Sequence, residues 1–216
     1  MNAVTLPRLQ IVILAAGFSS RLGQPKALVR VRGISLLRRT LALAAQFAPA
    51  KIIVVLPRRS VRYRIEARGL KVVFVANRRR ADGLSSSVRL GVAQARYSPA
   101  LLLLPVDLAM LQSRDLAGLI SRWRSVRRCV IARRIEPHGR AHSAETPRGG
   151  VPLILPRWLY ARALAVTGDV GLRELVGGLP AQQRVLLHLP SAALDVDTPQ
   201  DLRAVRRRLR PSGVSL

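Results

Sequence analysis

Short apolar runs recur along the chain, and most of them are separated by stretches with helical periodicity. Runs typical of buried strands lie at 11–15, 51–56, 71–75, 100–105, 129–132, 151–155 and 184–189. Helical patterns lie at 34–47, 58–68, 87–95, 115–124, 157–166, 170–176 and 199–209. This alternation predicts an α/β fold, a single Rossmann-like three-layer domain over residues 1–216 with a mainly parallel central sheet. A ligand is then expected beyond the carboxyl ends of the strands.

Composition supports a globular protein, because 49% of the 216 residues are hydrophobic. No apolar run approaches the ~20 residues that a membrane helix needs, and residues 1–10 lack the pattern of a secretion leader. The single cysteine, Cys129, excludes an internal disulfide and a multi-cysteine metal site, and a buried strand thiol is the expectation for it. Together these features predict a cytoplasmic protein.

Charge is the unusual property of this chain. Thirty-seven Lys and Arg residues stand against eleven Asp and Glu, which gives a net charge of +26. Such a field attracts polyanions, so nucleic acid is a rival partner. The arginines are scattered, however, and the chain has only two Trp, three Tyr and three Phe to stack on bases. We therefore expect nonspecific adhesion to nucleic acid at low salt rather than a dedicated nucleic-acid function.

The loop that follows the first apolar run combines three features that suit a phosphate group. Glycines let backbone N–H groups approach an anion, serine hydroxyls add donors, and two cations add charge. The Walker-type loop and the dinucleotide fingerprint are both absent. The residues concerned are Gly17, Gly23, Ser19, Ser20, Arg21 and Lys26.

The same stretch fits the pattern L-A-A-G-x-S-x-R-x-G-x-P-K, and it resembles the signature loop of the sugar-nucleotide and cofactor nucleotidyltransferases. Within that group the molybdenum cofactor cytidylyltransferases are the nearest in appearance. The resemblance implies a nucleotide-diphospho-sugar transferase-like fold, with Arg21 and Lys26 as catalytic residues. Family members that use CTP tend to carry A-A-G here, and guanylyl-transferring relatives tend to carry A-G-G, so the loop favours CTP. The implied nucleotide-binding residues in it are Leu14, Ala15, Ala16, Gly17 and Ser19.

Acidic residues are few, so their positions carry information. Asp107 comes directly after the run at 100–105, and Asp195 and Asp197 lie two apart in extended chain. Carboxylates suit Mg²⁺, although turn or capping duty is the ordinary alternative. The resemblance implies that Asp107 and Asp197 bind Mg²⁺, and it leaves Asp195 open. Asp201 is expected to cap a helix, because Thr198-Pro199-Gln200-Asp201 has the form of a capping box.

Two further segments match the same family. Gly83, Ser87 and Gly91 fit G-x-x-x-S-x-x-x-G, which implies that Gly83 and Ser87 bind the nucleotide, with a helix cap by Ser85 or Ser86 as the alternative. On the acceptor side the resemblance implies Gly150, Asp169 and Arg173, and capping is the alternative for Asp169. The chain departs from the family pattern at Val151 and Ala109. Both departures put the identity of the acceptor in doubt more than the chemistry.

The resemblance implies Mg²⁺-dependent transfer of CMP from CTP to a phosphorylated acceptor such as molybdopterin, with a molybdoenzyme as a further partner. One alternative is transfer to a sugar phosphate or a phosphorylated alcohol. Another is a catalytically weak relative that acts as a cofactor-binding or chaperone-like partner of a molybdoenzyme. The remotest is a nucleic-acid-binding protein. The three histidines, His138, His142 and His188, have no partners at metal-ligand spacing and receive no catalytic role.

Overall fold

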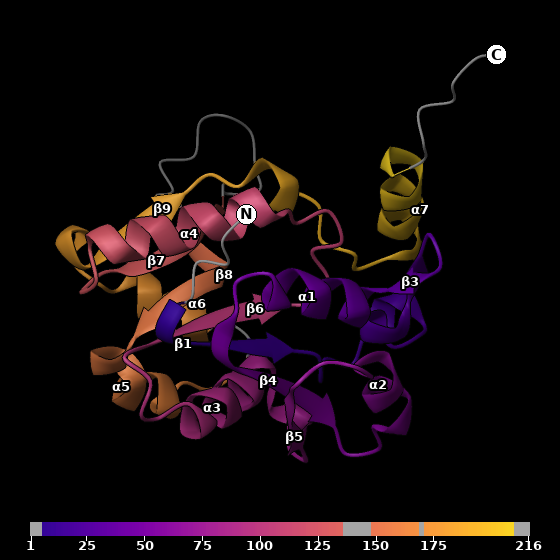
Figure 1. Ribbon diagram of the computed structural model, residues 1–216, viewed down its shortest axis with the longest axis horizontal. Coiled ribbons are helices and arrows are strands. Elements are labelled where there is room, and N and C mark those ends of the chain that lie inside the picture. Colours follow the sequence, from indigo (N-terminus) through magenta and orange to yellow (C-terminus); the bar gives the residue numbers. More distant parts are fainter. Residues whose placement is uncertain (1–5, 136–147, 169–170, 210–216) are drawn as a thin grey trace.

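In the computed structural model the described residues are 6–135, 148–168 and 171–209. A seven-stranded sheet forms the centre, in the order β5-β4-β1-β6-β8-β7-β9 (Figure 1). Only β8 runs antiparallel to its neighbours, so the predicted α/β fold with a mainly parallel sheet is confirmed. The strands are β1 (Leu6–Leu14), β4 (Pro49–Pro57), β5 (Val73–Asn77), β6 (Ala100–Pro105), β7 (Val130–Ile135), β8 (Arg148–Pro156) and β9 (Arg184–Leu187).

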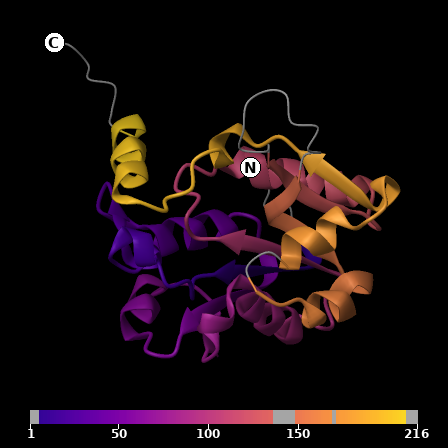
Figure 2. The ribbon, with the colours of Figure 1, turned by 180° about the vertical axis from the view of Figure 1, so that it is seen from behind.

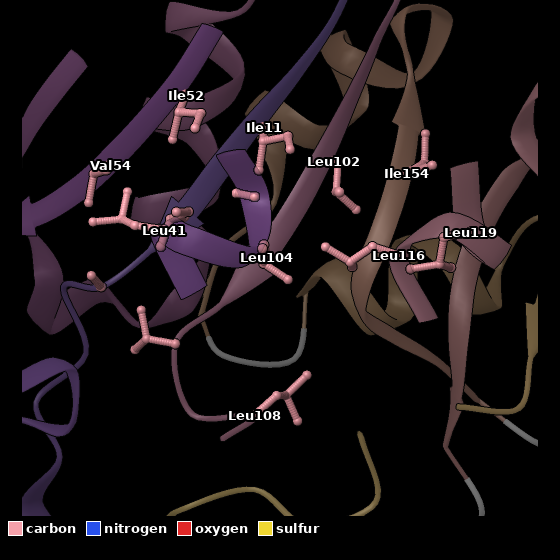
Figure 3. Close-up of a cluster of buried hydrophobic side chains, with 14 of the residues drawn as sticks. Ile11, Leu41, Ile52, Val54, Leu102, Leu104, Leu108, Leu116, Leu119 and Ile154 are labelled. Atoms are coloured by element: carbon pink, nitrogen blue, oxygen red, sulfur yellow. The ribbon is translucent and has the colours of Figure 1, made fainter. Parts of the chain in front are cut away.

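Helices cover both faces of the sheet, because the central strands are apolar on both sides. Ile11 and Ile13 of β1 belong to one core cluster, while Val12 and Leu14 belong to another on the opposite face. Figure 3 shows part of the first cluster, where Leu41 and Leu116 meet residues of the central strands. One face carries α1 (Leu36–Ala45), α2 (Val61–Glu66) and α4 (Ser113–Ser125), and the other carries α3 (Leu84–Gln94), α5 (Tyr160–Ala165) and α6 (Gly171–Gly177).

A third, smaller cluster lies apart from the two sheet faces. It joins the hairpin of β2 (Arg30–Val31) and β3 (Ile34–Ser35) to the last helix, α7 (Pro199–Arg208). Leu22 from the signature loop and Val196 from the segment before α7 both pack into it. Figure 2 shows α7 at the margin of the molecule, beside the N-terminal half of the chain. This cluster therefore holds the late segment that carries Asp195 and Asp197 beside the early loop.

Some predicted boundaries were wrong, and each has a local reason. The helix expected from Ser87 begins at Leu84, because Gly83 takes a φ of 83° and stands as its N-cap. Cys129 is half-buried and lies before β7 rather than in a buried strand, and its thiol donates to the carbonyl oxygen of Gln182 at 3.1 Å. The capping box at α7 is confirmed, since the Thr198 and Asp201 side chains each accept a hydrogen bond from the other residue's backbone N–H.

None of the helices in the described part of the chain is both long and apolar enough to cross a membrane. This finding leaves the predicted location as an expectation.

Candidate active site

A cavity of about 480 Å³ opens at the carboxyl edge of the parallel strands. Strand register explains its position, because Leu14 at the end of β1 pairs with Pro105 at the end of β6. The loops that leave these two strands, 15–26 and 106–112, therefore begin side by side. Every candidate site residue within the described chain lines this cavity: Leu14, Ala15, Ala16, Gly17, Ser19, Arg21, Lys26, Gly83, Ser87, Asp107, Gly150, Arg173 and Asp197.

Internal hydrogen bonds shape the signature loop around the cavity. Ser19 adopts a left-handed backbone with φ 56°, and its hydroxyl accepts a hydrogen bond from the backbone N–H of Lys26 at 2.9 Å. The backbone N–H of Ala15 donates to Val55 of the neighbouring strand at 2.9 Å. A Cβ added at Gly17 would meet no atom within 4 Å, so the loop leaves open space there for a ligand.

Lys26 lies between the two aspartates that the sequence suggested as metal ligands. Its ammonium group is 3.4 Å from Asp107 Oδ2, and it donates a short hydrogen bond to Asp197 Oδ1. Arg21, which is largely exposed, reaches the other oxygen of Asp197 at 3.4 Å. A backbone hydrogen bond of 3.0 Å from Val196 to the carbonyl of Asp107 ties the two carboxylate-bearing segments together.

Burial and charge oppose each other at this cluster. Burial raises the pKa of Asp107, and the nearby Asp195 and Asp197 raise it further, while Lys26 lowers it. Burial would lower the pKa of Lys26, but its interactions with Asp107 and Asp197 outweigh that effect and the pKa rises. The site thus brings several carboxylates close together, and a nearby cation stabilises their negative charge. Two converging carboxylates that leave room for phosphate oxygens fit Mg²⁺, which binds through few protein ligands.

Asp195 has a different partner. Its carboxylate accepts a hydrogen bond of 2.9 Å from Arg133, a nearly buried arginine on β7. Asp195 and Arg133 both line the cavity, and Asp195 lies near enough to Asp107 to raise the pKa of that carboxyl. In the described residues no group of three or more His, Cys, Asp or Glu side chains is arranged to hold a metal. Asp195 therefore differs from Asp107 and Asp197 in its partner, which is Arg133 rather than Lys26.

The amino end of α3 forms a second wall of the cavity. Asn77 at the end of β5 donates from its amide to Ser86 at 2.8 Å and to Ser87 at 2.9 Å. The alternative of a cap by Ser85 or Ser86 is wrong, because both serines lie inside the helix and Gly83 is the N-cap. Ser86 instead donates from its hydroxyl to the carbonyl of Gly83 at 2.8 Å. Gly83, Leu84 and Ser87 of this helix start line the cavity, and the backbone N–H of Ser85 donates to the carbonyl of Gly168 at 3.1 Å.

Two of the motif glycines have packing roles. A Cβ on Gly91 would lie 2.6 Å from Val12 Cγ1, so this glycine permits α3 to approach β1 closely. Gly91 is not among the residues that line the cavity. A Cβ on Gly150 would lie 2.2 Å from Ile135 Cδ1, although Gly150 does line the cavity. Close packing accounts for Gly91 without any contact to a nucleotide.

Two of the three residues that the resemblance implied on the acceptor side, Gly150 and Arg173, line the cavity. Arg173 at the start of α6 lines the cavity, and Asp169 lies outside the described residues. Of the two departures from the family pattern, Val151 lines the cavity, whereas Ala109 is buried in the third cluster. Only the change at Val151 therefore alters the surface that a ligand meets.

Among the lining residues that sequence reasoning missed are one aromatic ring, that of Phe18, and two cations, Arg80 and Arg133. Phe18 occupies a variable position of the signature pattern, and Arg80 and Arg133 each belong to one of several arginine runs. In the sequence nothing separates these two arginines from their exposed neighbours.

Comparison with known proteins agrees with this geometry. Residues 11–185 match the family model described as the MobA-like NTP transferase domain. A search of curated protein sequences gave no match.

Among solved structures, Rv0371c from Mycobacterium tuberculosis is 26% identical, with a TM-score of 0.71 over 93% of this chain and 98% of the other. Its complex with manganese gives 25% identity and a TM-score of 0.66 over the same shares of the two chains. The 2-C-methyl-D-erythritol 4-phosphate cytidylyltransferase from Thermus thermophilus is 20% identical, with a TM-score of 0.68 over 93% and 98%. Molybdopterin-guanine dinucleotide biosynthesis protein A from Archaeoglobus fulgidus is 12% identical, with a TM-score of 0.66 over 92% and 97%. The last two show a shared fold, and the family match covers most of the chain: this protein belongs to the MobA-like NTP transferase family, a family of nucleotidyltransferases.

Proposed function

We propose that this protein, as one nucleotidyltransferase domain over residues 1–216, transfers CMP from CTP to a phosphorylated acceptor, molybdopterin, with Mg²⁺ as cofactor. The observation that carries the proposal is the convergence of Lys26, Asp107 and Asp197 in the cavity that the signature loop lines. A cation and two carboxylates at this place suit a triphosphate and a divalent metal together.

In the proposed reaction a phosphate oxygen of the acceptor attacks the α-phosphorus of the nucleotide. A new P–O bond forms as the bond to the β-phosphate oxygen breaks, and pyrophosphate leaves. Arg21 and Lys26 stabilise the negative charge that grows on the α-phosphate and the leaving group. Mg²⁺ held by Asp107 and Asp197 would supply further neutralisation of the triphosphate. A phosphate nucleophile is already ionised, so the reaction needs no general base.

Separate observations support the donor and the acceptor. The Ala15-Ala16-Gly17 sequence favours CTP in the family it resembles, and a cytidylyltransferase shares the fold. The match to a MobA-like domain and the likeness to a molybdopterin-guanine dinucleotide biosynthesis protein support molybdopterin. Manganese in a complex of Rv0371c supports a divalent metal in this chain.

A second candidate keeps the cavity and changes the acceptor to a sugar phosphate or a phosphorylated alcohol. Val151 motivates it, because this residue lines the cavity and departs from the family pattern where the acceptor is proposed to bind, so the identity of the acceptor is open. Under this candidate, CTP binding is unchanged and only the acceptor-dependent step differs.

The test is thermal stabilisation by CTP, GTP, ATP and UTP, each with and without Mg²⁺, followed by pyrophosphate release with molybdopterin and with sugar phosphates. We expect the largest shift for CTP with Mg²⁺ and release only with molybdopterin. A larger shift with another nucleotide would reject CTP as donor. Absence of a shift with all four would reject the nucleotidyltransferase proposal for this chain.

A further inference from the structure

Two loops meet across the nucleotide side of the cavity through an aromatic ring and a cation. Phe18 lies in the signature loop between Gly17 and Ser19, and Arg80 opens the short turn Arg80–Asp82 before α3. The Cζ atom of Arg80 lies 4.1 Å from the centre of the Phe18 ring. Both residues line the cavity, although Phe18 is 54% exposed. This contact joins the loop that binds phosphate to the loop that leads to Gly83 and Ser87.

The stacked geometry leaves the hydrogen-bonding edge of Arg80 available. A guanidinium stacks through its flat face, while its five N–H donors point outward in the plane of the group. In the described part of the chain, the guanidinium of Arg80 makes no hydrogen bond or ion pair with another residue. By contrast, Arg21, Lys26 and Arg133 each pair with an aspartate in the same cavity.

Local structure holds Arg80 in this position. The backbone N–H of Gly83 donates to the carbonyl of Arg80 at 3.3 Å, which closes the turn. Asn77 fixes the other end of the segment by accepting from the backbone N–H of Arg79 at 2.8 Å. The ring of Phe18 then limits the rotamers of the long side chain, which reduces the entropy lost when an anion binds.

We propose that Arg80 binds the terminal phosphates of the nucleoside triphosphate, and that Phe18 positions it for this contact. The inference rests on the proposed nucleotide site and adds to it a residue that selects triphosphate over monophosphate. The edge of a preorganised guanidinium matches two phosphate oxygens at once. Lys26 and Arg21 are already engaged with Asp197, so they suit the α-phosphate and the metal-bound region.

The test compares the affinities of CTP, CMP and inorganic tripolyphosphate for the wild-type protein and for Arg80→Ala, by titration calorimetry with Mg²⁺. Arg78→Ala is the matched control, because Arg78 is exposed in the same segment and does not line the cavity. We expect Arg80→Ala to weaken the affinity for CTP and for tripolyphosphate by about tenfold, because a charge-assisted hydrogen bond to the terminal phosphates is lost. The affinity for CMP should fall by less than about twofold. Arg78→Ala should leave all three affinities within about twofold.

Two more variants separate positioning from charge. Arg80→Lys keeps the charge and loses the planar edge, and Phe18→Leu removes the ring while Arg80 stays. We expect each to lose part of the preference for CTP over CMP, and unchanged melting temperatures would show that the fold is intact. Equal losses for CTP and CMP, or an Arg80→Ala variant that behaves as Arg78→Ala does, would overturn the role of Arg80. A wild-type protein that binds no nucleoside triphosphate would instead reject the nucleotide site itself.

Discussion

Lys26 and Asp197 form an ion pair although 171 positions separate them in the chain. The pair closes the signature loop onto the segment that precedes the last helix. Because Lys26 also reaches Asp107 at 3.4 Å, one ammonium group compensates two carboxylates. This relationship gives the proposed site its charge balance before any ligand binds.

Replacing Lys26 with alanine should lower turnover by about a hundredfold or more, because in the proposed mechanism the growing charge on the α-phosphate loses a stabilising cation. We expect the variant to fold. Addition of Mn²⁺ should raise its melting temperature by more than it raises that of the wild type. The Asp107–Asp197 pair would then have no cation between them. Lys51→Ala, at an exposed position of β4, is the control. Near-normal turnover in Lys26→Ala would remove Lys26 from the mechanism.

Asp197→Asn and Asp195→Asn should have different effects, although the two residues are neighbours in sequence. The first removes a proposed metal ligand, so we expect weaker Mn²⁺ binding in the presence of CTP and a large loss of turnover. The second removes the partner of Arg133 and no contact with Lys26, so Mn²⁺ affinity and turnover should fall less than in Asp197→Asn. Chelation with EDTA should abolish stabilisation by CTP in the wild type. Equal losses of Mn²⁺ affinity in the two variants would show that Asp195 contributes to metal binding as much as Asp197 does.

Gly91→Ala should destabilise the protein by about 1–3 kcal/mol, because the new methyl group would overlap Val12 Cγ1 on β1. Gly118→Ala in α4 is the matched control, since a Cβ there meets no atom within 4 Å. That control should stabilise the protein by about 0.5–1 kcal/mol through its better helix propensity. Urea unfolding of the two variants measures both effects. A stable Gly91→Ala variant would show that α3 and β1 separate easily.

Thr198→Ala should cost about 1 kcal/mol of stability, because the first turn of α7 loses the hydroxyl that accepts from the N–H of Asp201. Thr198→Ser keeps this acceptor and should stay within about 0.5 kcal/mol of the wild type. Since α7 packs into the cluster that includes Val196, we also expect weaker CTP-dependent stabilisation in Thr198→Ala. Urea unfolding and CTP-dependent thermal stabilisation are measured for both variants. Equal values for the alanine and serine variants would show that the cap contributes little to stability.

Periodicity was enough to predict the sheet and most helices, because the central strands are apolar on both faces and stand out as short runs. It failed at the start of α3, because Ser85 and Ser86 were expected in a loop, whereas Ser85, Ser86 and Ser87 all lie in the first turn of the helix. Their hydroxyls bond to Asn77 and to nearby carbonyl groups, which removes the usual penalty for polar groups in a buried helix.

The candidate site was predicted where the signature loop and the aspartates carry a recognisable spacing. The pairing of Arg133 with Asp195 and the stacking of Arg80 on Phe18 could not be predicted in the same way. Each joins segments that are distant in sequence, and an arginine run gives no sign of which member turns inward. Sequence spacing therefore indicates the reacting groups better than it indicates the groups that surround them.

The small cluster into which α7 packs has a consequence for folding during synthesis on the ribosome. Residues 6–105 contain the signature loop and four strands of the central sheet, whereas Asp197 lies 92 positions farther along the chain than Pro105. At a synthesis rate of about 5–20 residues per second, the early part has several seconds in which to fold first. A nascent chain at that stage would have Lys26 without its second carboxylate partner. The proposed site is therefore completed late in synthesis, when Val196 and Leu202 pack in the same cluster as Leu22.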